Sequence, residues 1–188
     1  RHALVTQVGY AYGGANVFRN PKEFTYNQIA TEFRFGLSEK WELGTFMSWN
    51  ANTEIIDSIS TKDMNPSYSL NARYNVFANK NGNLGFLANI ASESTNTESY
   101  TQYALVALYS KSLTNVVSVN TNLGYNYGQS ASYANYTLNA GFTMSKSFGF
   151  FVEGFGSFGE DKDDFFLDTG AWFLVSPDLQ FDVFLGKG

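Results

Sequence analysis

Few side chains in this sequence could carry catalytic chemistry. The single histidine is His2, next to the first residue, and there is no cysteine. Without a histidine base or a set of His and Cys ligands, neither a Ser/His/Asp triad nor a multi-His metal site can be assembled. We therefore expect no enzyme, no catalytic residue, no metal site and no cofactor.

Carboxylates offer two other kinds of site. Glu153, Asp168 and Asp182 are candidates for an acid–base pair, but ion pairing with arginine is the interpretation that we favour. The run from Glu160 to Asp164 has oxygen ligands suited to Ca²⁺, although it lacks the spacing of an EF-hand. We interpret this run as a solvated acidic loop.

The elements that position these residues are predicted by strict alternation. From Val117 to Tyr127, odd positions are mostly apolar or aromatic, and even positions are Ser, Asn, Asn, Gly and Asn. The same pattern recurs over 66–78 and 134–145. Successive side chains of a strand point to opposite faces, so each segment has one apolar and one polar face. The polar faces carry too few bulky residues for an ordinary core, which indicates that the apolar faces meet lipid.

Strands are expected wherever this alternation holds. We place them near residues 3–13, 24–36, 41–50, 66–78, 82–92, 100–110, 115–127, 134–145, 148–158, 164–175 and 178–187. Short connections such as 37–40 and 79–81 alternate with longer ones such as 14–23 and 51–65. Tight periplasmic turns and longer outer loops are typical of transmembrane barrels, so the first strand is expected to begin at the periplasmic side.

Composition excludes several other classes. No apolar run approaches the roughly 20 residues of a membrane helix, and mean hydropathy is −0.22. A net charge of −5 and a pI near 4.8 give no basic surface for nucleic acid. A soluble, aromatic-rich β-sandwich or lipocalin-like barrel remains the alternative, but it would have to cover a large exposed apolar surface.

Several motifs carry a resemblance to a known family. They are 119–125, 136–142, Phe150 to Phe155, Leu167 to Gly170 and Ser176 to Val183, with a looser match from Phe35 to Leu43. Together they resemble the outer-membrane transporters named after the meta-pathway of phenol degradation. The resemblance implies a barrel of about twelve strands. The family name comes from genetic context and does not identify a substrate.

The expected fold is all-β: a transmembrane antiparallel up-and-down barrel of about twelve strands, formed by residues 1–188 as a single domain. Family members continue beyond the Gly-Lys-Gly region into one more strand, so we expect the closing strand to be missing here. Bacterial single-chain barrels generally have even strand numbers, and an open edge in lipid is costly. The expected location is the outer membrane of a Gram-negative bacterium, with lipid and other outer-membrane proteins as partners.

Alternation also predicts which side chains face the lumen. The expected charged network consists of Glu32, Arg34, Glu42, Arg73, Glu153, Asp168 and Asp182. Asn120, Asn122 and Asn139 share the polar face, and Phe46, Phe151, Phe155, Trp172 and Phe184 also point inward. The opposite, outward face carries Val117, Val119, Leu123 and Tyr125.

Two functions fit this lumen. The network either lines a route for small polar solutes, with its acidic excess favouring cations, or it plugs a narrow barrel. The first reading predicts a channel or transporter. The second predicts a non-conducting structural barrel that serves as a subunit or accessory of a larger outer-membrane complex.

Overall fold

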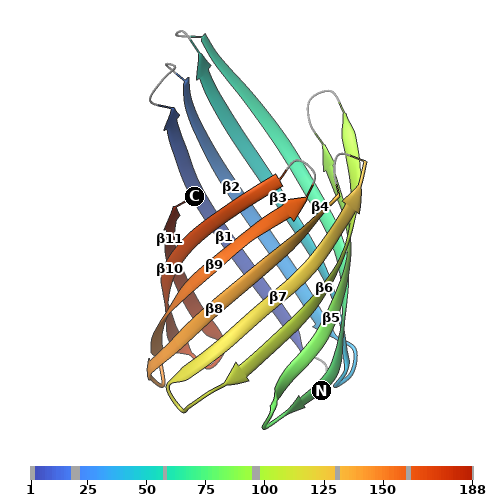
Figure 1. The fold of residues 1–188 in the computed structure, drawn as a ribbon, viewed down its shortest axis with the longest axis vertical. Helices are drawn as coiled ribbons and strands as arrows, with labels where there is room; N and C mark the ends of the chain where they lie inside the picture. The colour runs from blue at the N-terminus through green and yellow to red at the C-terminus, as the bar shows by residue number, and fades with distance from the viewer. Residues whose placement is uncertain are drawn as a thin grey trace. The chain divides into compact units, whose positions relative to one another are not determined.

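The structure is a computed structural model that describes residues 3–17, 22–56, 59–94, 98–129, 132–159 and 162–187. These residues form eleven strands and no helix, which confirms the all-β prediction (Figure 1). The strands are β1 (Leu4–Val17), β2 (Lys22–Gly36), β3 (Trp41–Ile56), β4 (Ile59–Asn79), β5 (Gly82–Ser94), β6 (Ser99–Ser112), β7 (Val117–Gly128), β8 (Tyr133–Ser145), β9 (Phe148–Gly159), β10 (Lys162–Ser176) and β11 (Leu179–Lys187). The described residues therefore include no helix that could cross a membrane.

The strands form one sheet in the order of the sequence, from β1 to β11. Neighbouring strands pair antiparallel from β1 to β3 and from β7 to β11, for example with Gln7 opposite Glu32 and Asn120 opposite Asn139. This is the up-and-down topology expected from the alternation of short turns and longer connections. Strands β1 and β11 stand at the two ends of the order, and the twelfth strand stays a prediction.

The chain divides into two compact units. Unit 1 comprises Arg1–Arg73, Asn89–Tyr103 and Gly128–Ser130, and therefore contains β1, β2, β3 and the first part of β4. Unit 2 comprises Tyr74–Ala88, Ala104–Tyr127 and Ala131–Gly188, and contains β8 to β11 with parts of β4 to β7.

The short turns are closed by side chains that accept backbone hydrogen bonds. Ser38 Oγ accepts from the backbone N–H of Lys40 and Trp41, and Thr114 Oγ1 accepts from Val116 and Val117 in the same way. Short polar side chains commonly stabilise turns by such local bonds. Related bonds to Asn79, Ser145 and Ser176 close the other three short turns.

Two predicted loops are largely strand, so that part of the prediction was wrong. Of the expected loop 51–65, residues 51–56 continue β3 and residues 59–65 begin β4. The β-branched residues Thr53, Ile55 and Ile59 give this stretch strand propensity without strict alternation of polarity. Residues 14–17 likewise extend β1, and residues 18–21 of the other expected loop lie outside the described residues.

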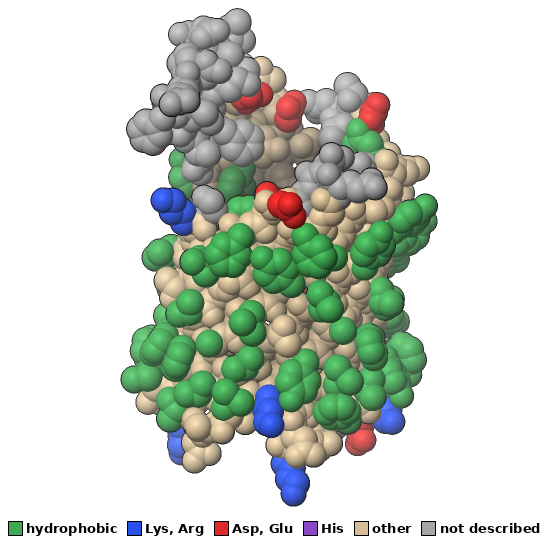
Figure 2. Space-filling model, in the orientation of Figure 1, with side chains coloured by type: hydrophobic (Ala, Val, Ile, Leu, Met, Phe, Trp, Pro, Cys, Tyr) green, Lys and Arg blue, Asp and Glu red, His purple; other side chains and the backbone are tan. Residues whose placement is uncertain are grey.

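The described residues contain no fully buried hydrophobic side chain. One face of the sheet in unit 1 is apolar, and its residues are highly exposed: Leu4, Val8, Ile29, Phe33, Phe35, Leu43 and Leu70. The corresponding apolar face of unit 2 carries Leu123, Tyr125, Leu138, Val152, Leu167, Val183 and Leu185. Figure 2 shows hydrophobic side chains spread over the strands that face the viewer, with charged side chains near their ends.

The opposite faces are polar and hold the predicted network. The polar face of unit 1 carries Glu32, Arg34, Glu42, Ser48, Asn71 and Arg73. The polar face of unit 2 carries Asn120, Asn122, Asn139, Glu153, Asp168 and Asp182. In register, Val117, Val119, Leu123 and Tyr125 oppose Phe142, Ala140, Tyr136 and Ala134, so the predicted apolar face of this segment is confirmed.

Candidate functional site

Unit 1 pairs its charges within the polar face. Arg73 Nη1 on β4 lies 3.7 Å from Glu42 Oε1 on β3, and Arg34 Nε lies 3.9 Å from Glu32 Oε2 on the same strand. The Arg73 and Glu42 side chains are 30% and 25% exposed. A partly exposed pair of this kind contributes less than a buried one, since water screens it.

A glycine makes room beside these pairs. Gly44 lies opposite Arg34 in the β2–β3 register, and the amide oxygen of Asn71 lies 2.5 Å from where a Cβ of residue 44 would stand. A side chain at position 44 would therefore displace Asn71. The absence of a side chain there lets the polar groups of β2, β3 and β4 pack closely.

Several polar atoms of this face lack hydrogen bonds. Glu42 Oε1, Arg73 Nε and Arg34 Nε have almost no exposed surface and no hydrogen-bond partner among the described residues. Buried polar atoms in proteins are nearly always satisfied, often by ordered water. We therefore expect water on the polar face of unit 1.

Unit 2 builds a hydrogen-bonded row across its strands instead. Asn120 Nδ2 on β7 donates to Asn139 Oδ1 on β8 over 3.2 Å, and Asn139 Nδ2 donates to Glu153 Oε2 on β9 over 3.2 Å. The register brings these residues side by side, and Asp168 on β10 lies opposite Glu153. We call Asn120, Asn139, Glu153 and Asp168 the polar row.

The polar row ends in two carboxylates without a cation. Among the described residues no Lys or Arg pairs with Glu153, Asp168 or Asp182, and Asp168 Oδ1 has no hydrogen-bond partner. Like charges directly opposite each other in a sheet repel. This end of the row therefore attracts a proton, a cation or water.

Aromatic rings fill the rest of this polar face. The Phe151 ring lies within 2.5 Å of where a Cβ of Gly170 would stand, and the Trp172 ring does the same at Gly149. Phe155 and Phe166 stack with ring centroids 5.3 Å apart. Rings that cross glycines on neighbouring strands reduce the open space above the sheet.

The structure thus distributes the seven predicted charged residues over both units. It brings Glu32 together with Arg34, Glu42 with Arg73, and Glu153 opposite Asp168, while Asp182 accepts a 2.8 Å hydrogen bond from Gln180. Their exposure to a lumen stays a prediction. His2, Glu160 and Asp161 lie outside the described residues, and no described group of three or more His, Cys, Asp or Glu could hold a metal ion.

Sequence reasoning missed the partners of two side chains that alternation places on the polar face. Gln28 Nε2 donates to Asn50 Oδ1 over 2.8 Å, and Asn71 covers Gly44. Alternation places such residues on the correct face, but only the cross-strand register shows which of them meet.

The arrangement can solvate and bind small polar or charged species. No protein-family model matches the chain, and no curated protein is significantly similar to it in sequence. Function therefore has to be inferred from the faces themselves.

Proposed function

We propose that the chain forms a transmembrane β-barrel in a bacterial outer membrane and passes small polar solutes along its polar faces. One observation carries the proposal: no described large hydrophobic side chain is fully buried, while Leu123, Val8 and Leu185 are 60%, 71% and 73% exposed. Burying apolar area is the main force that stabilises folded proteins. A surface of this kind is covered when it faces lipid.

Strand length supports the same proposal. The described strands contain 9 to 21 residues, and a tilted membrane strand needs about 9–11. Strands of soluble proteins are usually shorter, about 5–6 residues. The longest strand, β4, extends beyond what the hydrocarbon core requires.

The polar faces support passage of solutes and a preference for cations. Charges that face lipid are costly, so the polar faces are expected to enclose water. The carboxylates of Glu153, Asp168 and Asp182 have no basic partner among the described residues, and rings of carboxylates favour cations in channels. The resemblance to the transporter family named after phenol degradation points to the same class.

A non-conducting structural barrel is the second candidate. The stacked Phe155 and Phe166, and the rings over Gly149 and Gly170, occupy the polar face of unit 2. Such filling favours a plugged interior. In this reading the chain is a subunit or accessory of a larger outer-membrane complex.

Single-channel recording in planar lipid bilayers distinguishes the two candidates. We expect discrete conductance steps and, in a KCl gradient, a reversal potential on the cation-selective side. The double variant Glu153→Gln/Asp168→Asn should shift the reversal potential toward zero, whereas Glu39→Gln, in the exposed turn after β2, should not. Folded protein that inserts without conducting would favour the structural candidate, and anion selectivity would contradict the role given to the carboxylates.

A further inference from the structure

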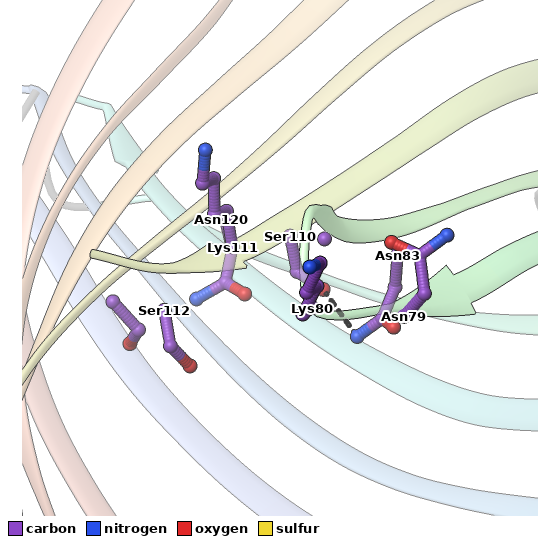
Figure 3. Close-up of a pocket in the computed structure, with 9 residues that line it drawn as sticks. Asn79, Lys80, Asn83, Ser110, Lys111, Ser112 and Asn120 are labelled. Carbon is purple, nitrogen blue, oxygen red and sulfur yellow. Dashed lines mark hydrogen bonds between the residues drawn. The ribbon is translucent and has the colours of Figure 1, made fainter. Parts of the chain in front are cut away.

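A second polar site lies at the end of unit 2 where the short turns gather. It is a pocket of about 240 Å³ formed by the β4–β5 turn, the last residues of β6 and the first part of β7. Figure 3 shows its lining, which includes Asn79, Lys80, Asn83, Ser110, Lys111 and Asn120. The lining residues are Asn, Ser, Lys and Gly, and none is acidic or apolar.

The β4–β5 turn that carries Lys80 is held firmly. Asn79 Oδ1 accepts a 2.8 Å hydrogen bond from the Asn81 N–H, and the Tyr109 hydroxyl donates to the Asn81 carbonyl over 3.1 Å. Gly82 has a φ of 131°, a conformation that favours glycine. These contacts fix the backbone on both sides of Lys80, which lines the pocket.

The pocket is lined by possible hydrogen-bond donors and by two lysines, and its lining contains no acidic residue. Asn83 Nδ2 donates to Ser110 Oγ over 3.1 Å, a bond that joins β5 to β6 across the pocket and is drawn in Figure 3. Lys80 and Lys111 form no ion pair with any described residue. The lining of the site therefore includes two lysines together with amide and hydroxyl groups.

We propose that this pocket binds a small oxyanion, a phosphate or a carboxylate. Ammonium, amide and hydroxyl groups together form charge-assisted hydrogen bonds to the oxygens of such anions. Pockets for drug-sized ligands occupy roughly 300–1,000 Å³, so a pocket of about 240 Å³ fits a smaller molecule. A cation is disfavoured, since both formal charges of the lining are positive.

The pocket also touches the polar row. Asn120 lines it and donates to Asn139, which in turn donates to Glu153. An anion at the turn end and the carboxylates of the row are thus connected by two amides. Binding at the pocket does not depend on whether the barrel conducts, so it can be tested separately.

The test is a titration of the full chain with inorganic phosphate in phosphate-free maltoside micelles at low salt, followed by amide NMR. We expect saturable shifts at Asn83, Ser110 and Asn120. The double variant Lys80→Gln/Lys111→Gln should raise the dissociation constant about fivefold or more, because it removes both positive charges of the lining.

Two controls distinguish binding at this specific pocket from nonspecific attraction to surface charge. Lys146→Gln removes an exposed lysine of another short turn and should leave the affinity unchanged. Lys80→Arg/Lys111→Arg keeps both charges and should retain binding. Retained binding in this variant would show that replacing the two lysines does not by itself destroy the pocket. Absent or non-saturable shifts, an unchanged affinity in the glutamine double variant, or an equal loss in Lys146→Gln would overturn the proposal.

The phosphate bound by the pocket could belong to a lipid headgroup or to a free solute. Measurements in a lipid bilayer distinguish these two sources. In nanodiscs of phosphatidylglycerol, a pocket that takes free phosphate should still show the titration seen in micelles. If lipid phosphates occupy the pocket, the shifts at Asn83 and Asn120 should be present before any phosphate is added and should be absent in nanodiscs of Lys80→Gln/Lys111→Gln.

Discussion

The polar faces of the two units handle charge in different ways. Among the described residues of unit 1, both arginines pair with a glutamate, as Arg73 does with Glu42 at 3.7 Å. In unit 2, Glu153 and Asp168 lie opposite each other without a cation, and Glu153 accepts a hydrogen bond from the end of a row of asparagine amides. The first face is close to neutral, and the second keeps a local negative charge.

Because of this difference, removing a charge should have different effects in the two units. Removing one partner of a pair in unit 1 leaves the other charge unpaired on a face that is only partly exposed. Neutralising a carboxylate in unit 2 removes a repulsion instead. Stability should therefore depend mainly on the charges of unit 1, and ion selectivity mainly on those of unit 2.

The largest effect is expected from Arg73→Leu. The change leaves Glu42 without a cation, and we expect a loss of about 2–3 kcal/mol, below the value for a fully buried pair because both side chains are partly exposed. Thermal unfolding in detergent micelles measures it. Glu42→Gln/Arg73→Leu should recover most of the loss, and Glu153→Gln should change stability by less than about 0.5 kcal/mol. A loss in Glu153→Gln equal to that in Arg73→Leu would remove the distinction between the units.

A smaller effect on stability is expected from replacing a glycine, and it should differ between the two polar faces. A Cβ at Gly170 would meet the Phe151 ring at 2.5 Å and the Val183 carbonyl oxygen at 2.6 Å, whereas the three atoms nearest to a Cβ at Gly44 all belong to the side-chain amide of Asn71. Backbone and rings cannot move aside as a flexible amide can, so Gly170→Ala should cost about 1–2 kcal/mol and Gly44→Ala less than about 1 kcal/mol. Urea unfolding of the two variants gives the comparison. The opposite ranking would show that the rings of unit 2 are loosely held.

The smallest effect is a gain in stability. Asp168→Asn replaces a repelling carboxylate with an amide that can donate to Glu153, and we expect a gain of about 0.2–1 kcal/mol. The melting temperature at neutral pH should rise by a few degrees and the difference should shrink in high salt, which screens the repulsion in the parent protein. A lower melting temperature for this variant would mean that Asp168 has a cationic partner after all.

Much of the fold could be predicted because polarity alternates where one face meets an apolar surface. All eleven strands appear where alternation placed them. The prediction failed over 51–65, where β3 and β4 continue although apolar and polar residues no longer alternate strictly. Pro66 reads as a turn signal, yet it lies inside β4. Proline has no backbone N–H, so it cannot donate a hydrogen bond to a neighbouring strand.

The site could be predicted only as sets of residues that share a face. Alternation placed Arg73, Glu42, Glu153 and Asp168 on polar faces, but which of them meet depends on cross-strand register. Register is set by turns and by irregularities such as those between Thr143 and Ser145 and between Leu174 and Ser176. The pairing of Arg73 with Glu42 was therefore one of several possibilities before the structure.

The central claim, that the apolar faces meet lipid and the polar faces meet water, is tested most directly by labelling along β7. The chain has no cysteine, so single cysteines at positions 119 to 125 can each carry a nitroxide in protein reconstituted into liposomes. We predict that positions 119, 123 and 125 collide mainly with oxygen and positions 120, 122 and 124 with a water-soluble nickel complex, in strict alternation. Uniform access to the nickel complex, or alternation with the opposite phase, would contradict the account.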